Sequence, residues 1–393
     1  MKHIKIVIIF LILSSVISSK GSFILKAEAQ NIENKVYPVD SFVKDNSLKK
    51  QTIKPTLDEK VGQMLIVGFY GLTVNNESSI IKDIKEHHLG GVVLYDYDNT
   101  SGLYERNIKS PKQVKTLTSK LQAAAKIPLL VAVDQEGGMV QRLKKEYGFP
   151  NVFSAQFLGK KNDLNRTYKD AETIATTLKN VGINFNFAPV VDLNINPTSP
   201  AIGNLKRSFS ADPVVVTNHA AKFIEAHRTH KVINALKHFP GHGSSTDDSH
   251  LAITDITDTW KNIELKPYIK LINDGMVDVI MTAHVFNRNL DPMFPATLSK
   301  ITINGWLRGS LKYNGVIISD DMQMQSILSS YSLETAIKKS IEAGIDIILT
   351  CNNSQYDKGV VARMIDIIKT SVSEKKIDES YNRIMRLKKK WLY

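Results

Sequence analysis

An aspartate and a histidine stand two residues apart at the end of residues 237–250, a segment dense in chemically active side chains. The segment opens with Lys237 and His238 and continues as a loop rich in glycine and serine. On an extended chain Asp248 and His250 point the same way. A carboxylate beside an imidazole fixes its tautomer and stabilises its charged form. The pattern therefore predicts that His250 gives and takes protons near neutral pH, with Asp248 as its partner.

A metal site is the competing interpretation of this segment, because His238, His242 and His250 are close in sequence. Pro240 and Gly241 break any helix that would place His238 and His242 on one face. The segment also lacks the glutamate of the zinc-protease pattern. A third interpretation makes the histidines structural loop residues, which suits His242 better than the whole group. We therefore expect no metal here.

A pair of acidic residues, Asp320 and Asp321, follows the apolar run 315–318. A carboxylate at the end of such a strand can attack the anomeric carbon of a sugar and stabilise an oxocarbenium-like transition state. Alternatively, Ser319 or either acid could cap the helix that follows. Since two adjacent acids allow both roles, we assign catalysis to Asp320 and capping or support to Asp321.

Two weaker segments suit the recognition of hydroxyl or carbonyl groups. In one, Asp134 follows an apolar run and precedes a pair of glycines and Arg142. In the other, Arg207 could reach the carbonyl or carboxylate of a ligand. Taken alone, Arg207 would more often be a surface arginine.

The elements that must position these residues repeat along the chain from Thr56 onward. Short apolar runs rich in β-branched residues alternate with helical stretches, which is typical of a parallel α/β fold. About eight such runs are present, at 64–67, 91–95, 128–133, 183–187, 232–236, 277–281, 316–318 and 345–349. Helical stretches are expected at 110–125, 164–181, 214–230, 260–273 and 334–343, with closing helices in 356–393.

Eight strands are the number that closes a single (β/α)8 TIM barrel, whose active site lies at the C-terminal ends of the strands. Polar and ionisable residues follow these runs repeatedly: Asp134 to Glu136, Asp192, Lys237 and His238, His284, and Asp320 and Asp321. We therefore predict that this rim of the barrel is an active site.

The composition of the 393 residues excludes several classes of protein. With 42% hydrophobic and 23% charged residues, the chain is neither disordered nor collagen-like nor a coiled coil. Only one long apolar run exists, which excludes a polytopic membrane protein. The single cysteine, Cys351, excludes an internal disulfide and a cysteine zinc cluster.

The one long apolar run lies at the N-terminus. Basic residues precede the apolar residues 6–13, and small residues and the pattern Ala27-Glu28-Ala29 follow, which is typical of a secretory signal. A retained anchor helix is the alternative, although the run is short for a membrane span. No cysteine follows the run, so a lipoprotein anchor is excluded. We expect residues 1–29 to be a signal peptide or anchor, 30–55 a polar linker, and 56–393 the catalytic barrel, outside the cytoplasm as a secreted or cell-envelope protein.

The formal net charge is +12, which would attract an exported protein to an anionic cell wall or membrane surface. A basic surface without a partner is the alternative. We expect no nucleic-acid partner, because the sequence contains no basic helix with interleaved aromatic residues and no nucleic-acid module. We expect a monomer.

Together the motifs resemble the glycoside hydrolase family 3 β-N-acetylglucosaminidases, which trim N-acetylglucosamine from cell-wall fragments. The resemblance runs from about Thr56 to the C-terminus. It is carried by the segments 237–243 and 248–250, by 319–324, by 281–284 and by 295–299.

The resemblance implies a retaining exo-β-N-acetylglucosaminidase that needs no metal or organic cofactor and acts on carbohydrate, either peptidoglycan fragments or related glycans. It implies that Asp320 is the nucleophile and that His250 is the acid/base, partnered by Asp248. The family's sugar-binding positions match Asp134, Arg142, Arg207, Lys237 and His238.

The sequence also departs from the family pattern and leaves alternatives open. Met139 stands where an arginine is common, and Leu205 and Lys206 look like extra residues before Arg207, which affects the shape of the sugar pocket. A phosphorylase on the same scaffold, a β-glucosidase-type glycosidase and a wall-binding protein with a decayed site are the alternatives. Muropeptides, glycan ends and chitin oligomers are all candidate substrates.

Overall fold

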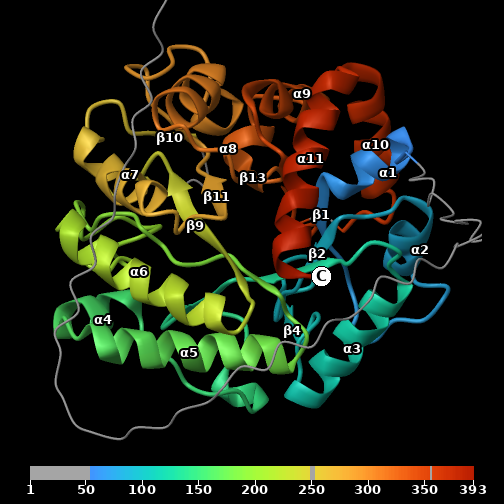
Figure 1. The fold of residues 1–393 in the computed structure, drawn as a ribbon, viewed down its shortest axis with the longest axis horizontal. Coiled ribbons are helices and arrows are strands. Elements are labelled where there is room, and N and C mark those ends of the chain that lie inside the picture. Colours follow the sequence, from blue (N-terminus) through green and yellow to red (C-terminus); the bar gives the residue numbers. More distant parts are fainter. Residues whose placement is uncertain (1–53, 248–252, 355) are drawn as a thin grey trace, which may run out of the picture. The chain divides into compact units, whose positions relative to one another are not determined.

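A closed barrel of parallel strands forms the body of the protein (Figure 1). The structure, a computed structural model, describes residues 54–247, 253–354 and 356–393. Within these residues the strands follow one another around the barrel in the order β1-β14-β13-β11-β9-β8-β5-β2. Every neighbouring pair is parallel. The predicted (β/α)8 barrel is therefore confirmed.

Each predicted apolar run overlaps one strand of the barrel. The strands are β1 (Leu65–Gly68), β2 (Gly91–Val93), β5 (Leu130–Val133), β8 (Phe185–Asn186), β9 (Ile233–Phe239), β11 (Val279–Thr282), β13 (Val316–Asp321) and β14 (Ile347–Thr350). Every residue of these strands is buried except Asp320 and Asp321, which are half-buried at the end of β13. Burial on both faces explains why the runs are continuously apolar rather than alternating.

Helices surround the barrel, and their starts follow from the sequence. The side chains of Ser110 and Asp212 accept hydrogen bonds from the first turns of two helices that begin with proline. The helices are α1 (Leu57–Gln63), α2 (Ser79–Glu86), α3 (Pro111–Ala124), α4 (Ala155–Lys161), α5 (Leu164–Asn180), α6 (Pro213–Thr229), α7 (Lys266–Asn273), α8 (Gln325–Leu328), α9 (Leu333–Ala343), α10 (Val360–Ser371) and α11 (Glu374–Trp391). Shorter helical turns cover Lys145–Tyr147, Asn262–Leu265 and Ala296–Leu298, and a π-helix covers Ile301–Ser310. In the described part of the chain, no helix is both long and apolar enough to cross a membrane.

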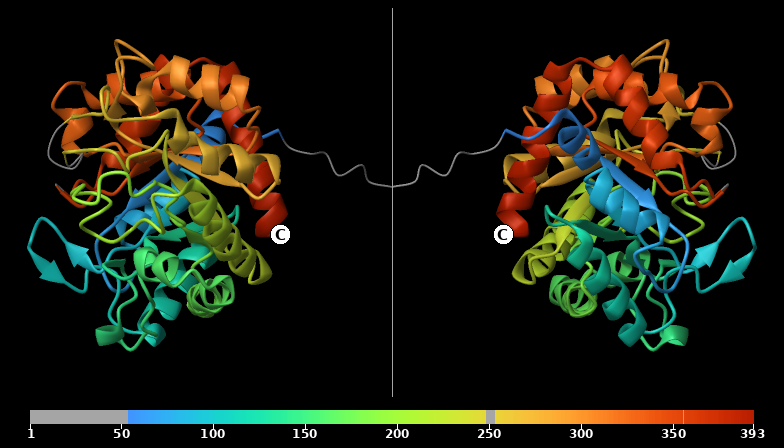
Figure 2. Two further views of the ribbon diagram at one scale, coloured as in Figure 1. Left: turned by 90° about the vertical axis from the view of Figure 1, so that its left-hand side faces the viewer. Right: turned by 90° about the vertical axis from the view of Figure 1, so that its right-hand side faces the viewer.

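Among the described residues, three pairs of short strands lie outside the barrel. β3 (Tyr97–Asp98) and β4 (Leu103–Tyr104) are antiparallel, as are β6 (Gln135–Gly137) and β7 (Val140–Gln141). β10 (Thr254–Asp255) pairs in parallel with β12 (Val285–Phe286). Figure 2 shows β3 and β4 projecting from the body of the barrel, on the side away from the C-terminus of the chain. The sequence analysis did not anticipate these pairs, because strands of two or three residues have no period.

A buried carboxylate ties two outer helices to the barrel. Asp346, which precedes β14 and is fully buried, lies 2.6 Å from Arg308 Nη2 and 3.0 Å from Arg383 Nη1. It also accepts a hydrogen bond from the main-chain nitrogen of Ile317 at 2.9 Å. Arg308 belongs to the π-helix and Arg383 to α11. Asp346 thus joins both helices to β13 and β14.

Replacing Asp346 by alanine should destabilise the barrel strongly. Two guanidinium groups would lose their partner in a largely buried place, which costs about 3 kcal/mol of unfolding free energy or more. The measurement is urea unfolding. The midpoint concentration should fall, while the slope of the unfolding free energy against urea concentration stays unchanged. The matched control is Asp378→Ala, which breaks a more exposed pair with Lys60 and should cost less than about 1 kcal/mol. Equal losses in the two variants would contradict the anchoring role of Asp346.

Candidate active site

A pocket of about 490 Å³ opens at the C-terminal ends of the barrel strands. Six of the eight predicted site residues line it: Asp134, Arg142, Arg207, Lys237, His238 and Asp320. The other two, Asp248 and His250, lie outside the described residues. The barrel therefore brings together residues of β9 and β13, the residue that follows β5, and residues of two loops.

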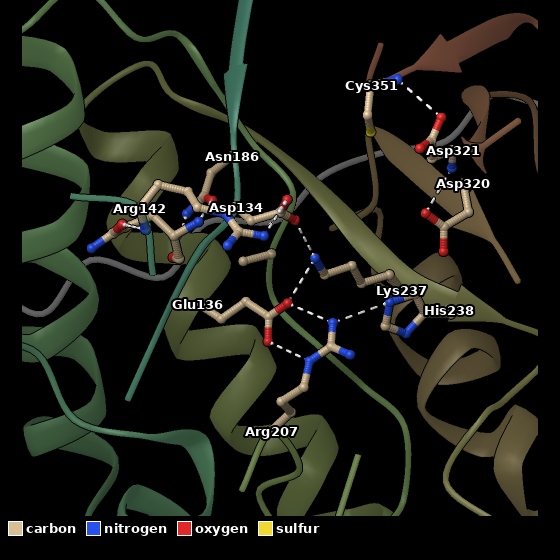
Figure 3. Close-up of polar contacts among 12 residues, drawn as sticks. Asp134, Glu136, Arg142, Asn186, Arg207, Lys237, His238, Asp320, Asp321 and Cys351 are labelled. Carbon is tan, nitrogen blue, oxygen red and sulfur yellow. Dashed lines mark hydrogen bonds and ion pairs between the residues drawn. The ribbon is translucent and has the colours of Figure 1, made fainter. Parts of the chain in front are cut away.

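The ammonium group of Lys237 is buried between two carboxylates. Lys237, near the end of β9, is 2% exposed. Its Nζ donates to Asp134 Oδ1 at 2.7 Å and lies 2.7 Å from Glu136 Oε1 (Figure 3). Burial alone would lower the pKa of Lys237, but the attraction of Asp134 and Glu136 outweighs burial and raises it. Lys237 is therefore a permanent cation.

The two carboxylates are permanent anions for the same reason. Burial would raise the pKa of Asp134, but the charges of Lys237 and Arg142 lower it to about 2. For Glu136 the opposing effect of Arg207 and Lys237 also exceeds that of burial, and its pKa is lowered. The sequence analysis gave Glu136 no role, although its position two residues after Asp134 was a usable signal, because alternate residues of an extended chain share a side.

Arg207 forms a bidentate ion pair with Glu136 through two parallel hydrogen bonds. Its Nε donates to Glu136 Oε2 at 2.9 Å and its Nη2 to Oε1 at 2.7 Å, while Nη1 donates to the carbonyl of Ala201 at 2.9 Å. The side chain is only 9% exposed, so the surface interpretation of Arg207 is wrong. Arg207 holds the carboxylate network in place and also lines the pocket.

His238 is a neutral histidine whose proton sits on Nδ1. Its Nε2 lies 3.2 Å from Arg207 Nη2, and its Nδ1 lies 2.7 Å from Asp192 Oδ2. Because a guanidinium can only donate, Nε2 must accept, and Nδ1 therefore donates to Asp192. Burial first, and then the charges of Arg207 and Lys237, lower the pKa of His238 well below its usual value.

Asp192 also fixes the start of the glycine-rich loop that follows β9. Its carboxylate accepts hydrogen bonds from the main-chain nitrogens of His238 at 3.2 Å and His242 at 2.9 Å. Gly243 packs closely on Leu193, the residue that follows Asp192. A Cβ at position 243 would lie 1.7 Å from the carbonyl oxygen of Leu193. Only glycine fits, so the loop has one path from the end of the strand.

Glu264 holds the same loop from its other side. It is 1% exposed and lies in the helical turn before α7. Its carboxylate accepts from Ser244 Oγ at 2.7 Å and from the main-chain nitrogen of Gly243 at 3.2 Å. Burial raises the pKa of Glu264 to about 7, despite the opposing hydrogen bond from Ser244. The sequence analysis missed this residue, because nothing in its local pattern separates it from a surface glutamate.

Asp320 reaches the pocket from the end of β13, and Asp321 supports it. The main-chain nitrogen of Asp321 donates to Asp320 Oδ1 at 2.8 Å. The Asp321 side chain accepts from the main-chain nitrogens of Cys351 at 2.9 Å and Gln323 at 3.1 Å. Asp321 therefore joins the ends of β13 and β14.

The two roles suggested for Asp321 can now be separated. Helix α8 begins after Met324 without a side-chain cap, so capping of this helix is wrong and support is right. Burial raises the pKa of Asp321 to about 6, and the charge of Asp320 acts in the same direction. His284 contacts the end of β13 as well. Its side chain is buried, and its Nε2 lies 3.0 Å from the carbonyl oxygen of Asp321.

Figure 3 shows the carboxylates on two sides of the end of β9. In this view Asp134, Glu136 and Arg207 lie on one side of Lys237 and His238, and Asp320 and Asp321 lie on the other. No group of three His, Cys, Asp or Glu side chains within residues 54–247, 253–354 and 356–393 is arranged to hold a metal ion.

The remaining wall of the pocket is built around Arg142. Its guanidinium lies 3.7 Å from Asp134 Oδ2, 3.9 Å from Asp96 Oδ1 and 5.2 Å from the centre of the Tyr95 ring. The hydroxyl of Tyr95 lies 2.7 Å from the thiol of Cys351, which is buried in the same wall. Arg142 thus combines an ionic contact with an aromatic one.

Both departures from the family pattern face the pocket. Met139 lies in the turn between β6 and β7, lines the pocket and is 59% exposed. Leu205 also lines the pocket, and Lys206 beside it has a positive φ of 57°. The extra residues therefore shape the entrance.

Comparison with known proteins places the chain among glycosidases. The model of the glycosyl hydrolase family 3 N-terminal domain matches residues 56–387. A β-hexosaminidase of Idiomarina loihiensis is 38% identical over 256 residues, which cover 64% of this chain and 76% of that protein. β-Hexosaminidase A of Pseudoalteromonas piscicida is 32% identical, over 78% of this chain and 54% of its own length.

Solved structures agree with the sequence relatives. A family 3 β-N-acetylglucosaminidase of a Paenibacillus species superposes with a TM-score of 0.78 at 35% identity, over 86% of this chain. The match spans 63% of that chain, so this protein corresponds to less than two thirds of it. A β-N-acetylhexosaminidase of Beutenbergia cavernae superposes with a TM-score of 0.74 at 28% identity, over 85% of this chain and 98% of that one.

The raised pKa of Glu264 predicts a specific pH dependence of stability. The native state favours the protonated carboxyl, so this stability is complete below the ordinary pKa of 4.5 and is lost as the pH rises toward about 7. In Glu264→Gln the amide keeps an acceptor for Ser244 but does not ionise. The thermal midpoint of the wild type should therefore fall more than that of the variant between about pH 5 and about pH 7.5.

The control for this measurement is Glu225→Gln, which removes a carboxylate that is 51% exposed on α6. It should follow the pH dependence of the wild type. Parallel curves for the wild type and Glu264→Gln would show that Glu264 ionises as easily in the folded protein as in the unfolded chain.

Proposed function

The chain belongs to glycosyl hydrolase family 3 and is a glycoside hydrolase of the β-N-acetylhexosaminidase type; on that premise we propose that it removes terminal, β-linked N-acetylglucosamine with retention of configuration. The observation that carries the proposal is the half-buried carboxylate of Asp320, which faces a pocket shared with the Lys237 network. The pocket thus offers a nucleophile and polar groups that can bind sugar hydroxyls.

The charges in the pocket support a cationic transition state. Lys237 and Arg207 are balanced by Asp134 and Glu136, and His238 is neutral. This group therefore adds no net charge beside Asp320. The group therefore does not weaken the field of Asp320, whose negative charge would stabilise positive charge on the sugar ring.

In the proposed first step, an oxygen of Asp320 bonds to the anomeric carbon. The bond from that carbon to the leaving oxygen breaks, its electron pair goes to that oxygen, and His250 supplies the proton. The product of the step is a glycosyl ester on Asp320. In the second step neutral His250 takes a proton from water, whose oxygen bonds to the anomeric carbon and releases Asp320 as a carboxylate.

The roles of His250 and Asp248 rest on the sequence motif, as these residues lie outside the described part of the structure. Among the described residues, Asp192 and Glu264 hold residues 238–244, which end three residues before Asp248 is reached.

Substrate source and location complete the proposal. We propose that the substrates are peptidoglycan fragments or related glycans, and that the protein acts outside the cytoplasm. The N-terminal signal pattern and the net charge of +12 support this location, because an anionic wall attracts a basic protein. Product analysis on purified peptidoglycan fragments against chitobiose tests the source, and omission of phosphate separates hydrolysis from phosphorolysis.

Removal of the nucleophile should abolish turnover. Asp320→Ala is expected to lower kcat on a chromogenic N-acetylglucosaminide at least about 10³-fold, because it removes the side chain proposed to form the ester. A fluorosugar that accumulates the ester should label Asp320 in the wild type, as read by mass spectrometry of peptides. Turnover similar to that of the wild type, or a label on another residue, would remove Asp320 from this role.

Removal of the proton donor should depend on the leaving group. His250→Ala is expected to lose about 10²-fold or more in kcat/KM on glycosides of poor leaving groups, which need the proton. Activated aryl glycosides need it much less and should lose far less. A series of aryl glycosides with graded leaving-group pKa is the measurement, and equal losses across the series would mean that His250 only binds substrate.

A further inference from the structure

One side of the pocket entrance carries large apolar side chains that are exposed to solvent. Leu103 and Tyr104 of β4 are each 62% exposed, and Met139 in the turn between β6 and β7 is 59% exposed. We call these three residues the lip. None of them belongs to the hydrophobic core, so the fold does not require an apolar residue at these positions.

The hairpin that carries Leu103 and Tyr104 is fastened to the wall of the pocket. Asn99, in its turn, lines the pocket, as does Asn353 beyond β14. Asn353 accepts from the main-chain nitrogen of Asn99 at 3.0 Å and donates to the carbonyl of Tyr97 at 3.1 Å. The hairpin therefore stands at the edge of the entrance, and it projects beyond the barrel (Figure 2).

The ring of Tyr104 is held in place by two neighbours. The ring of Tyr97 lies 5.0 Å away and is tilted by 60°, and Lys144 Nζ lies 5.1 Å from the ring centre. Most of Tyr104 nevertheless remains exposed. An ordered aromatic ring with an open surface can bind a ligand at a low entropic cost.

Lys144, the cation beside the lip, already has a partner. Its Nζ lies 2.6 Å from Asp96 Oδ2, and Asp96 is fully buried. The groups that remain open to a ligand here are therefore the apolar side chains of the lip and the exposed amide of Asn99, because the buried amide of Asn353 is bonded to Asn99, Arg106 and Tyr97. A neutral ligand with apolar faces and polar edges fits such a surface better than an anionic one.

We propose that the lip binds the sugar that follows the cleaved bond, and that Tyr104 determines how much this sugar contributes to kcat/KM. The proposal rests on the proposed function of the pocket. A β-linked pyranose with equatorial substituents presents C–H groups on its faces and hydroxyl and acetamide groups on its edges. Its faces can lie on Tyr104, Leu103 and Met139, and its edges can bond to the exposed amide of Asn99. The lip thus makes substrate length a determinant of kcat/KM.

The test compares two substrates that differ only beyond the cleaved bond: chitotriose and methyl β-N-acetylglucosaminide. In Tyr104→Ala the ratio of kcat/KM on chitotriose to kcat/KM on the methyl glycoside should fall about tenfold, since only chitotriose reaches the lip. Tyr104→Phe keeps the ring and should keep the ratio. Tyr393→Ala, which removes an exposed tyrosine at the C-terminus, is the matched control and should keep both rates.

Each other outcome overturns the proposal in a distinct way. An unchanged ratio in Tyr104→Ala would mean that the lip does not bind the sugar. Equal losses on both substrates would mean that the hairpin only supports the pocket. A loss confined to a muropeptide, with chitotriose unaffected, would assign the lip to a peptide-bearing ligand. If the wild type cleaved neither glycoside, the proposed function itself would fail, and the lip proposal would fail with it.

Discussion

The burial of one amine, that of Lys237, explains most of the arrangement of the pocket. An ammonium group taken out of water must be paired, and Lys237 is paired with Asp134 and Glu136. A second buried carboxylate then needs a second cation, which is Arg207. The donors of Arg207 leave only an acceptor role for His238 Nε2, so the proton of His238 must go to Asp192. Requirements of charge and hydrogen bonding thereby fix, one after another, the segments that carry these residues: 134–136, 192, 207 and 237–238.

This balance of charge also determines what Asp320 can do. Had the pocket contained Lys237 and Arg207 without their carboxylates, two cations would neutralise the field of Asp320. The pairing removes that effect, while the main-chain nitrogen of Asp321 orients the Asp320 side chain. The Asp321 side chain in turn accepts a hydrogen bond from the main-chain nitrogen of Cys351, the residue that follows β14. The position of Asp320 therefore depends on the closure of the barrel between β13 and β14.

The barrel could be predicted from the sequence because its strands are buried on both faces and therefore appear as continuous apolar runs. Asp134, Lys237, His238 and Asp320, which line the pocket, could also be singled out, because ionisable groups at the ends of such runs are conspicuous, whereas Arg142 and Arg207 depended on weaker segments and on the family resemblance. Asp192, which lies several residues beyond β8, was noticed but received no role, because its partners His238 and His242 are distant in sequence. Glu264 was missed for the same reason. The β3–β4 hairpin was missed because its strands are only two residues long and β4 faces solvent.

The use of a histidine as the proposed acid/base follows from the crowding of carboxylates around this pocket. Asp134, Glu136, Asp192 and Asp321 already stand at the strand ends with Asp320, and the pKa of Asp321 is already raised, in part by its charged neighbour. A further carboxylate close to the anomeric carbon would raise the pKa of Asp320 and weaken it as a nucleophile. An imidazole that has given up its proton is neutral and has no such effect. It can therefore serve both steps of the reaction while leaving Asp320 ionised.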